Sequence, residues 1–503
     1  MNKTYLVIIS LIVAMGGFLL GFDSAVISGA VNGIKTQFTM TDVELGFAVG
    51  CVIFGAMFGN ISAGPLADRF GRKSVLLITA ILFMISAGWS ALATSYMTFV
   101  VARIIGGIGV GAAILIAPIY IAEIAPAKLR GSLVSFNQLN IVIGISVAYF
   151  SNYALVNIGD ESWRYMLGVE VIPALLYFLL LFIVPMSPRW LLKNKKDQEA
   201  AKDVLVKIGG EDYAEKTLED IRKNSKKVEE KGSAKEFFSS RMRLILIISF
   251  GLAFFQQITG INAIFYYAPT IFEQAGGSTD SSLLQAIVVG LTNLTFTFVA
   301  IYLIDRLGRK PLLLIGTGMM TIALGLASFA FYNATYTLSP ENIAKVGKEE
   351  NRAVLLSHVD KVFDSQNSFL DFAKENLDAE DYPAFQQNDL KSFISIQSNL
   401  VLFAILLYVA AFAISLGPVM WAMLSEIFPS RLKGIAISIV GFFNSLVSYT
   451  VTQLFPWELN NLGPTITFLI FATLAFLSFI FVKRFVVETK GKSLEELEEI
   501  LTN

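Results

Sequence analysis

The sequence predicts an all-α membrane protein with twelve transmembrane helices in two pseudo-symmetric halves of six. Three observations support this fold class. Of the 503 residues, 54% are hydrophobic and 16% are charged, whereas soluble proteins carry about 25% charged residues. Twelve apolar runs are long enough to cross the ~30 Å hydrocarbon core of a bilayer. Two sequence motifs also recur in the two halves of the chain.

The apolar runs are predicted to be helices rather than barrel strands, because backbone polar groups must be paired within lipid and the runs are too long for strands. They span residues 5–31, 44–66, 74–94, 97–122, 131–156, 165–186, 244–272, 281–304, 311–332, 397–424, 435–458 and 464–486. The first run resembles a signal peptide at its start, but it lacks a small-residue cleavage site in the usual place. It is interpreted as a retained span.

Lys and Arg in the short loops predict the orientation. One side holds "DRFGRK" (68–73), "DRLGRK" (305–310) and further basic residues, whereas the short loops of the other side hold only Lys35 and Arg164. By the positive-inside rule, the basic side and both termini face the cytoplasm of a cell that carries the protein in its plasma or inner membrane.

Two polar segments interrupt the spans and suggest a domain division. Residues 191–243 carry 14 Lys/Arg and 11 Asp/Glu and are expected to form short cytoplasmic helices. Residues 333–396, with six Lys/Arg and eleven Asp/Glu, are expected to form a small acidic external subdomain. The predicted units are an N-terminal half (1–190), the linker (191–243), a C-terminal half (244–486) that contains the insertion, and a cytoplasmic tail (487–503).

The repeated motifs place the two halves in register. "GPLADRFGRK" (64–73) recurs as "AIYLIDRLGRK" (300–310), and "AEIAPAKLRG" (122–131) recurs as "SEIFPSRLKG" (425–434). The second separation exceeds the first by 66 residues, which matches the insertion. Internal duplication of this kind is typical of alternating-access transporters, which bind substrate at the midplane between their halves.

Several function classes are unsupported. Cys51 and His358 are the only residues of their types, so neither a disulfide nor a zinc site is expected, and no metal or other cofactor is predicted. The Gly-Lys-Ser sequence at 491–493 lacks the preceding glycine of a phosphate-binding loop. A net charge of −1 gives no support for a nucleic-acid partner. No nucleophile and base set suggests an enzyme.

Three charged residues lie inside predicted spans and away from the span ends: Asp23, Arg103 and Glu170. An ionisable group within a membrane span is a functional candidate, because exposing it to lipid costs several kcal/mol. Helix rise places all three in the outer half of the bilayer, where they can meet. A pair of Asp and Arg that breaks and reforms would load and release a proton. A static structural ion pair is the alternative.

Polar side chains in other spans suit a neutral ligand covered with hydroxyl groups, because Gln and Asn both donate and accept hydrogen bonds. These residues, with one aromatic, are Gln138, Asn140, Gln256, Gln257, Asn262, Asn293, Trp421 and Asn444. The alternative is that they only join helices to one another.

The chain resembles the sugar porters of the major facilitator superfamily from end to end, apart from the insertion. The resemblance rests on the repeated loop motifs and on "PMSPRWL" (185–191), "QQITGIN" (256–262) and "VETKGKSLEEL" (487–497). It implies the major facilitator fold. The chain departs from the family pattern at Met186, Val487 and Lys433, where the family has Glu, Pro and Arg.

The resemblance implies that charged loop residues form gating salt bridges when the cytoplasmic side is closed. These residues are Asp68, Arg69, Arg72, Glu123, Arg130, Asp305, Arg306, Arg309, Glu426 and Lys433. A role in orientation alone is the alternative. Because Lys cannot grip a carboxylate with two parallel bonds as Arg does, Lys433 should weaken the network of the second half.

The resemblance also implies the substrate site, with Gln138, Gln256, Gln257, Asn262, Asn293, Trp421 and Asn444 as sugar ligands and Ile145 lining the pocket. Gly260 and Pro269 favour a bent or broken seventh span. Tyr266 follows Asn262 by one turn and is placed in the same wall, and Tyr266 with Tyr267 is expected to form the outer gate.

The predicted function is therefore a monomeric, proton-coupled monosaccharide symporter whose partners are the sugar, protons and the bilayer. Much of the sequence is similar to proton-coupled xylose-transporting members of the family, whereas Ile145, Phe265 and Asn444 are similar to glucose facilitators. A glucose-type hexose is favoured over xylose. An uncoupled facilitator and a non-transporting sugar sensor are the alternatives.

Overall fold

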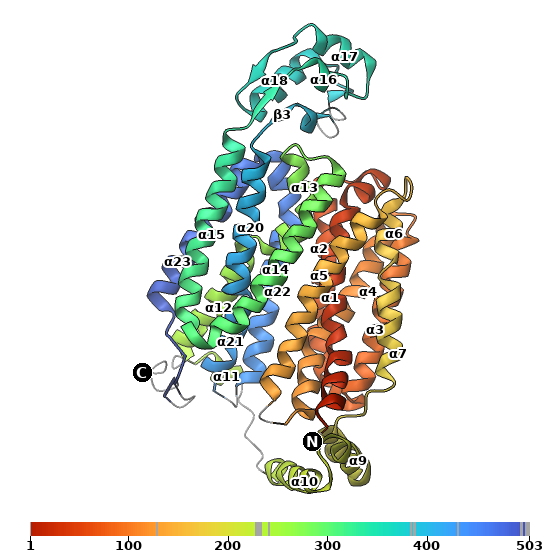
Figure 1. Ribbon diagram of the computed structural model, residues 1–503, viewed down its shortest axis with the longest axis vertical. Coiled ribbons are helices and arrows are strands. Elements are labelled where there is room, and N and C mark those ends of the chain that lie inside the picture. The colour runs from red at the N-terminus through yellow and green to blue at the C-terminus, as the bar shows by residue number, and fades with distance from the viewer. Residues whose placement is uncertain are drawn as a thin grey trace.

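The computed structural model describes residues 2–126, 129–226, 234–239, 242–382, 385, 389–429, 432–492 and 496–497. Within these residues, twelve helical spans are long and apolar enough to cross a membrane. They form one bundle in which the first and second halves of the chain lie side by side (Figure 1). The predicted all-α fold with twelve spans is confirmed.

The spans of the first half are α1 (Lys3–Gln37), α2 (Asp42–Phe70), α3 (Arg72–Ala91), α4 (Tyr96–Ile124), α5 (Arg130–Leu155) and the pair α6 (Ser162–Gly168) and α7 (Val171–Leu181). Those of the second half are the pair α12 (Arg243–Ile258) and α13 (Ile261–Gln274), α14 (Thr279–Leu307), α15 (Arg309–Tyr332), the pair α20 (Ser398–Ile414) and α21 (Leu416–Ile427), α22 (Lys433–Asn461) and α23 (Gly463–Phe485).

Three spans are broken, and only one break was expected. The seventh span divides at Gly260, which has a φ of 93°, a conformation that glycine adopts without a steric penalty. A second, smaller kink follows at Tyr267 (φ −123°, ψ 19°). The breaks at Glu170 in the sixth span and at Ser415 in the tenth were not predicted, although Gly168 precedes the first and Gly417 and Pro418 follow the second.

The repeated loop motif has a structural reason. α3 and α15 each begin directly after a glycine with a positive φ, 92° at Gly71 and 94° at Gly308. A residue with a side chain would be strained in this conformation. The glycine therefore lets the chain reverse within one residue between two antiparallel spans in each half.

Small residues bring neighbouring helices into backbone contact. A Cβ atom added at Gly107 of α4 would lie 2.2 Å from the Val52 carbonyl oxygen of α2, and one added at Gly21 of α1 would lie 1.9 Å from the Ile141 carbonyl oxygen of α5. Backbone approach of this kind is a principal source of helix association in membranes. The close approach also fixes α1 and α4 tightly enough to position the charged residues that they carry.

The two halves meet through α2 with α22, α5 with α14, and α1 with α13. A Cβ atom at Gly46 would lie 1.9 Å from the Gln453 carbonyl oxygen, and the Tyr149 hydroxyl donates to the Phe265 carbonyl oxygen at 2.7 Å. These contacts fall in the half of the bundle that lies toward the insertion, away from the chain termini (Figure 1). The halves are thus joined at one end of the bundle.

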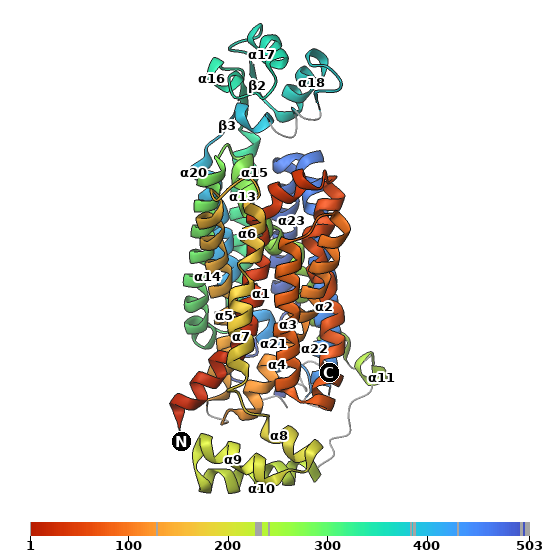
Figure 2. The same cartoon turned by 90° about the vertical axis from the view of Figure 1, so that its right-hand side faces the viewer.

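Short helices cover the end of the bundle where both termini lie: α8 (Pro188–Trp190), η1 (Leu191–Lys195), α9 (Gln198–Gly209), α10 (Glu211–Lys226) and α11 (Ala234–Phe237). Figure 2 shows α9 and α10 below the first half. α9 buries Ala201, Val204, Leu205 and Ile208 on one face, as expected for an amphipathic helix. The domain limits at 190 and 243 stay a prediction.

The insertion forms a separate small unit at the opposite end (Figures 1 and 2). It consists of β1 (Thr335–Thr337), α16 (Pro340–Ile343), α17 (Glu349–Leu356), β2 (Val362–Phe363), α18 (Gln366–Asn376), η3 (Leu390–Phe393) and β3 (Ile394–Ser395). The strands form an antiparallel sheet in the order β2-β1-β3. Phe363, Phe369, Phe385 and Phe393 fill its core. The sequence did not predict these short strands.

Candidate functional site

Four predicted amides of the second half share one buried hydrogen-bonded cluster. Gln257 Nε2 donates to Asn444 Oδ1 at 3.1 Å, and Asn444 Nδ2 donates to Gln256 Oε1 at 2.9 Å. Asn262 Nδ2 donates to Gln257 Oε1 at 3.0 Å. Side chains of Gln256, Gln257 and Asn444 are at most 9% exposed. We call Gln256, Gln257, Asn262, Asn444 and Ser448 the amide cluster.

The break in the seventh span builds this cluster. It ends α12 after Ile258 and restarts the chain as α13, so that Asn262 turns back toward Gln257, five residues earlier. The carbonyl oxygen of Thr259, left at the break, accepts a hydrogen bond of 2.9 Å from the buried Tyr408 hydroxyl. Because this carbonyl is paired, the break is a stable feature of the fold.

Sequence reasoning missed Ser448, whose hydroxyl accepts a hydrogen bond of 2.6 Å from Asn262 Nδ2. A signal was available, since Ser448 follows Asn444 by four residues in the same helix and therefore lies on the same face. The cluster is satisfied largely from within, because the donors of one amide meet the acceptors of the next. Sugar hydroxyls, which both donate and accept, match this chemistry.

The other predicted ligands do not join the cluster. Gln138 and Trp421 are exposed, Trp421 to 41%, while Asn293 and Ile145 are buried. Within the described residues, none of these four side chains forms a hydrogen bond with the amide cluster. Their assignment as ligands stays a prediction.

The three charges within the spans do meet. Asp23 of α1 accepts a hydrogen bond from Arg103 Nη1 of α4, and both interact with Glu170 at the break in the sixth span. All three residues are only 2% exposed. Asp23 Oδ2 and Glu170 Oε1 have no hydrogen-bond partner in the described residues. Two carboxylates around one guanidinium have a place for an additional proton.

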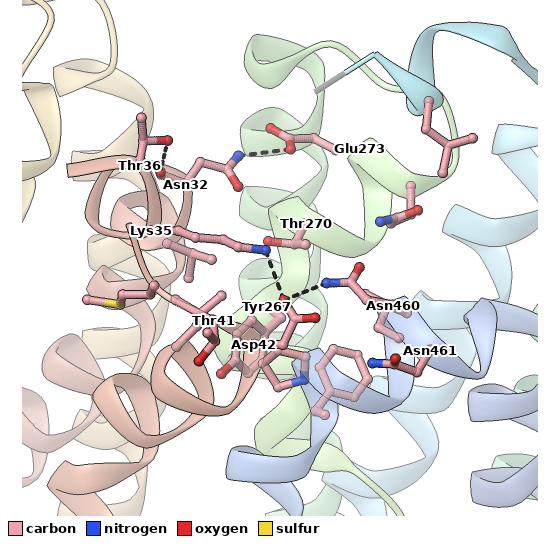
Figure 3. Close-up of a pocket in the computed structure, with 18 of the residues that line it drawn as sticks. Asn32, Lys35, Thr36, Thr41, Asp42, Tyr267, Thr270, Glu273, Asn460 and Asn461 are labelled. Atoms are coloured by element: carbon pink, nitrogen blue, oxygen red, sulfur yellow. Dashed lines mark hydrogen bonds and ion pairs between the residues drawn. The ribbon is translucent and has the colours of Figure 1, made fainter. Parts of the chain in front are cut away.

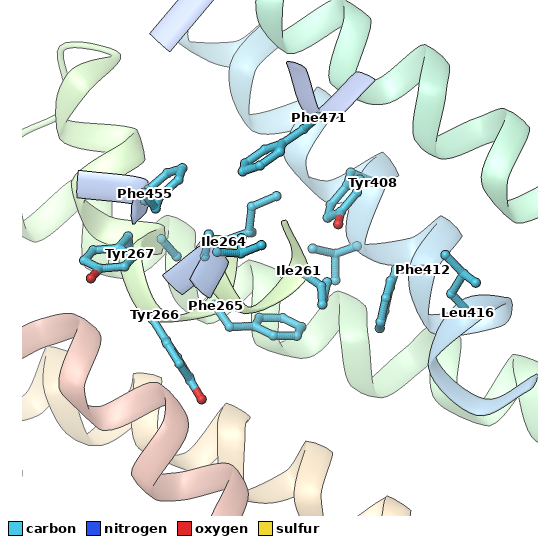
Figure 4. Close-up of a cluster of buried hydrophobic side chains, with 14 of the residues drawn as sticks. Ile261, Ile264, Phe265, Tyr266, Tyr267, Tyr408, Phe412, Leu416, Phe455 and Phe471 are labelled. Carbon is cyan, nitrogen blue, oxygen red and sulfur yellow. The ribbon is translucent and has the colours of Figure 1, made fainter. Parts of the chain in front are cut away.

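The two tyrosines of α13 separate from one another in space. Tyr266 points from α13 toward α1 and α5 of the first half (Figure 4), where its hydroxyl lies 3.5 Å from the Ser24 hydroxyl, next to Asp23. Tyr267 turns to the other side, packs on Phe455 with ring centroids 5.2 Å apart, and donates to the Thr452 carbonyl oxygen. The kink at Tyr267 produces this divergence.

Two equivalent ion-pair clusters lie near the end of the bundle that carries the termini. Arg72 contacts Glu123 at 3.0 Å and Asp68 at 3.2 Å. Arg309 contacts Glu426 at 2.8 Å and Asp305 at 3.4 Å. Each cluster lies within one half. The predicted internal duplication therefore extends to individual side-chain contacts.

Three of the remaining predicted gating residues, Arg69, Arg306 and Lys433, are described by the structure and lie outside these two clusters. Arg69 and Arg306 lie over neighbouring aromatic rings, and no ion pair to either, or to Lys433, occurs within the part of the chain that the structure describes. The Arg130 side chain is outside the described residues. A gating role for these residues, and a weaker network in the second half, stay predictions.

Three further residues complete these clusters and were not singled out from the sequence. The Ser187 hydroxyl donates to Glu123, and the Thr489 hydroxyl donates to Glu426 at 2.6 Å. Glu488 accepts hydrogen bonds of 3.0 and 2.9 Å from the backbone N–H groups of Arg309 and Lys310. These residues belong to motifs that the sequence shows, but their contacts depend on how segments far apart in the chain lie together in the fold.

Comparison with known proteins agrees with this geometry. The family model "Sugar (and other) transporter" matches residues 9–347 and 383–501. The D-xylose-proton symporter of Escherichia coli (strain K12) is 36% identical, covering 99% of this chain and 96% of that protein. The glucose transport protein of Synechocystis sp. is 34% identical, covering 99% and 97%.

A solved structure of the E. coli xylose transporter, in a partially occluded inward-open conformation, matches with a TM-score of 0.75 and 34% identity, covering 97% of this chain and all of that one. Duplicated six-helix halves with polar residues between and beside them define a multi-pass membrane transporter rather than an enzyme. The chain belongs to the sugar porter family of the major facilitator superfamily and is a sugar transporter.

Proposed function

We propose that this transporter imports a monosaccharide together with a proton by alternating access, with both termini in the cytoplasm. The excess of Lys and Arg at the end that carries the termini supports the orientation. In this orientation the two halves contact each other at their outer ends, as expected for a conformation that is closed to the outside. The relation to an inward-open structure supports the same assignment.

The observation that carries proton coupling is the buried group formed by Asp23, Arg103 and Glu170. A carboxylate that is paired with Arg stays ionised, whereas the same group without its partner in an apolar site takes up a proton. A conformational change that separates α1 from α4 would therefore load a proton on one side of the membrane and release it on the other. Glu170 supplies a second acceptor.

The contact between Tyr266 and Ser24 supports a link between sugar and proton. Tyr266 belongs to α13, which also carries Asn262 of the amide cluster, and Ser24 is adjacent to Asp23. A sugar that rearranges the amide cluster would shift α13 and, through this contact, the environment of Asp23. The proposed substrate is a glucose-type hexose or xylose, since the cluster suits a neutral polyol and both classes of sugar occur among the relatives.

Sugar uptake with and without a protonophore tests this proposal. Labelled glucose, xylose and galactose are supplied to cells or proteoliposomes, and external pH is recorded on addition of sugar. We expect the medium to become alkaline with the transported sugar in the wild type. Asp23→Asn should abolish this proton uptake while sugar counterflow persists, and Asp160→Asn, at an exposed carboxylate on the same side, should behave as wild type.

The two alternatives give different results in these assays. An uncoupled facilitator would transport sugar without alkalinisation of the medium in the wild type, and a sensor would show no counterflow. Proton uptake that survives Asp23→Asn would contradict the role given to Asp23.

A further inference from the structure

A cavity of about 580 Å³ lies between the two halves at their outer ends. Its walls come from α1 and α2 of the first half and from α13 and α22 of the second, while Gln366 and Leu390 of the external subdomain lie at its edge. Figure 3 shows side chains of both halves pointing into it. We call this cavity the outer vestibule. Its volume falls in the range of small-molecule sites, about 300–1,000 Å³.

The charged groups of the outer vestibule are already paired with groups of the protein. Lys35 Nζ lies 2.9 Å from Asp42 Oδ1, and Asn460 Nδ2 donates to the same oxygen at 2.8 Å. Asn32 Nδ2 donates to Glu273 Oε2 at 2.9 Å. The hydrogen bonds from Asn460 to Asp42 and from Asn32 to Glu273 join the first half of the chain to the second. The paired charges leave little attraction for an ion, so a neutral ligand is favoured.

Polar groups that remain open suit such a ligand. The Thr270 hydroxyl is buried without a hydrogen-bond partner in the described residues. Asn461 uses only its Nδ2, which donates to the Trp457 carbonyl oxygen, and the side-chain amides of Gln274 and Gln366 form no hydrogen bond within the described part of the chain. Amide groups, which both donate and accept hydrogen bonds, are suited to the hydroxyl groups of a sugar.

From this lining we infer that the outer vestibule is a second, low-affinity sugar site, distinct from the amide cluster and completed by the external subdomain. The inference rests on the proposed function. Tyr267 lies in the lining of the vestibule, and Tyr266, its neighbour in the chain, contacts Ser24 below, so the two tyrosines separate the vestibule from the interior.

The site exists only while the outer ends of the halves are together, because its walls come from both. A ligand that binds one conformation and not the other shifts the population toward the first. Sugar in the outer vestibule therefore holds the transporter closed to the outside and slows its return to the outward-open state. External sugar at high concentration should inhibit its own uptake.

Uptake kinetics from the outside test this consequence. For the wild type in proteoliposomes, initial uptake of D-glucose or D-xylose should rise, pass through a maximum and then fall by at least a third at the highest external concentrations. In Asn461→Leu and in Gln366→Leu, the external sugar concentration at which uptake begins to fall should be at least fivefold higher than in the wild type. The sugar concentration that gives half-maximal uptake on the rising part of the curve should change less than twofold. Hyperbolic uptake in the wild type up to 200 mM sugar would overturn the inference.

Asn376 provides a matched control. Its Nδ2 donates to the carbonyl oxygen four residues earlier, as that of Asn461 does, but it lies in the external subdomain away from the vestibule. Asn376→Leu should keep the inhibition of the wild type. Loss of inhibition in this variant as well as in Asn461→Leu would show that the effect comes from general disturbance, and would also overturn the inference.

A binding measurement separates this inference from the proposed function. In Gln257→Leu/Asn444→Leu, which disrupts the amide cluster, weak binding of labelled D-glucose or D-xylose in the millimolar range should remain, and adding Asn461→Leu should remove it. If the wild type binds sugar and the double variant binds none, the second site does not exist, but the proposed function stands. If the wild type itself binds none of the sugars, the proposed function fails and this inference fails with it.

Discussion

Met186 and Glu488 occupy equivalent positions in the two halves, and this difference gives a sharp test of the duplicated architecture. Each directly precedes the residue whose hydroxyl donates to the carboxylate of an ion-pair cluster: Ser187 donates to Glu123, and Thr489 donates to Glu426. Each also lies against the glycine that starts a span. A Cβ atom at Gly308 would be 2.7 Å from Glu488 Oε2, and one at Gly71 would be 3.4 Å from Met186 Sδ.

Only the second half gains a helix cap from this arrangement. Glu488 binds the first two backbone N–H groups of α15, whereas no hydrogen bond to the backbone N–H of Arg72 or Lys73 occurs in the described residues. A carboxylate at a helix N-terminus satisfies free N–H groups and interacts favourably with the helix dipole. Met186→Glu should therefore create a cap on α3 that the natural sequence lacks.

The expected gain in the free energy of unfolding can be estimated from the cap on α15. Replacing a capping side chain by a non-capping one costs about 0.5–2 kcal/mol, and a charge at the helix terminus adds about 0.3–1 kcal/mol at an exposed site. Because Met186 is half-buried, its loss removes some apolar contact. In Met186→Gln the new side chain has nearly the same size as Glu, so this variant loses the same apolar contact but adds no charge. We expect the Glu variant to be about 1 kcal/mol more stable than the Gln variant.

Denaturant unfolding in detergent micelles, followed by tryptophan fluorescence, measures this difference. The Trp190 ring lies 3.3 Å from a Cβ atom built at Gly71 and so reports on the site directly. Glu488→Gln provides the reverse experiment and should lower stability by a similar amount. The reasoning is refuted if Glu488→Gln is destabilising while the Glu and Gln variants of Met186 unfold at the same denaturant concentration, since the two positions would then not be equivalent.

Three further outcomes are expected. Gly260→Ala should destabilise the fold by about 1–3 kcal/mol, because φ is 93° and the added Cβ would lie 2.6 Å from the Phe471 ring; wild-type thermal stability would contradict the assigned break. Tyr266→Phe should weaken sugar-driven proton uptake more than sugar counterflow, because it removes the contact with Ser24, and an equal loss of both activities would argue against a coupling role. Burial of Glu488 opposes its ionisation, but hydrogen bonds from four backbone N–H groups outweigh this and lower its pKa below 4.5. The stabilisation that ionised Glu488 gives to the folded protein is complete above pH 4.5 and is lost as pH falls through the lowered pKa. The stability difference between wild type and Glu488→Gln should therefore vanish in acid.

The sequence predicted the fold because the bilayer imposes strict requirements on it. A span must be about twenty apolar residues long, and its backbone N–H and C=O groups must form hydrogen bonds within the helix. The twelve spans could therefore be identified from the sequence alone. The break at Gly260 was also expected, because a glycine interrupts an apolar helix. The break at Ser415 was not predicted. Gly417 and Pro418 follow it, but proline alone does not mark a break, since α2 and α4 continue through Pro65 and Pro118. The short strands of the external subdomain were missed for a similar reason, since strands of two or three residues have no detectable period.

It was harder to predict which side chains contact each other than to predict where each residue lies along its span. Asp23, Arg103 and Glu170 were expected to meet, because an isolated charge in a span is costly and three charges at one depth have few other partners. The contact of Ser448 with Asn262 required the register between α13 and α22. The sequence likewise gave no sign of the outer vestibule, which arises where the ends of helices from both halves come together with the external subdomain.

The place of α13 in the structure indicates how sugar and proton can be linked in one cycle. This helix is separated from α12 by the break at Gly260 and kinked again at Tyr267, so it can move without carrying the rest of its span. Its start belongs to the amide cluster through Asn262, and Tyr266 contacts the first half beside Asp23. Because a helix is stiff between its breaks, a sugar that pulls Asn262 must also displace Tyr266. In the proposed cycle the proton group would thus respond to substrate without touching it, and a further flexible break between Asn262 and Tyr266 should uncouple sugar from proton.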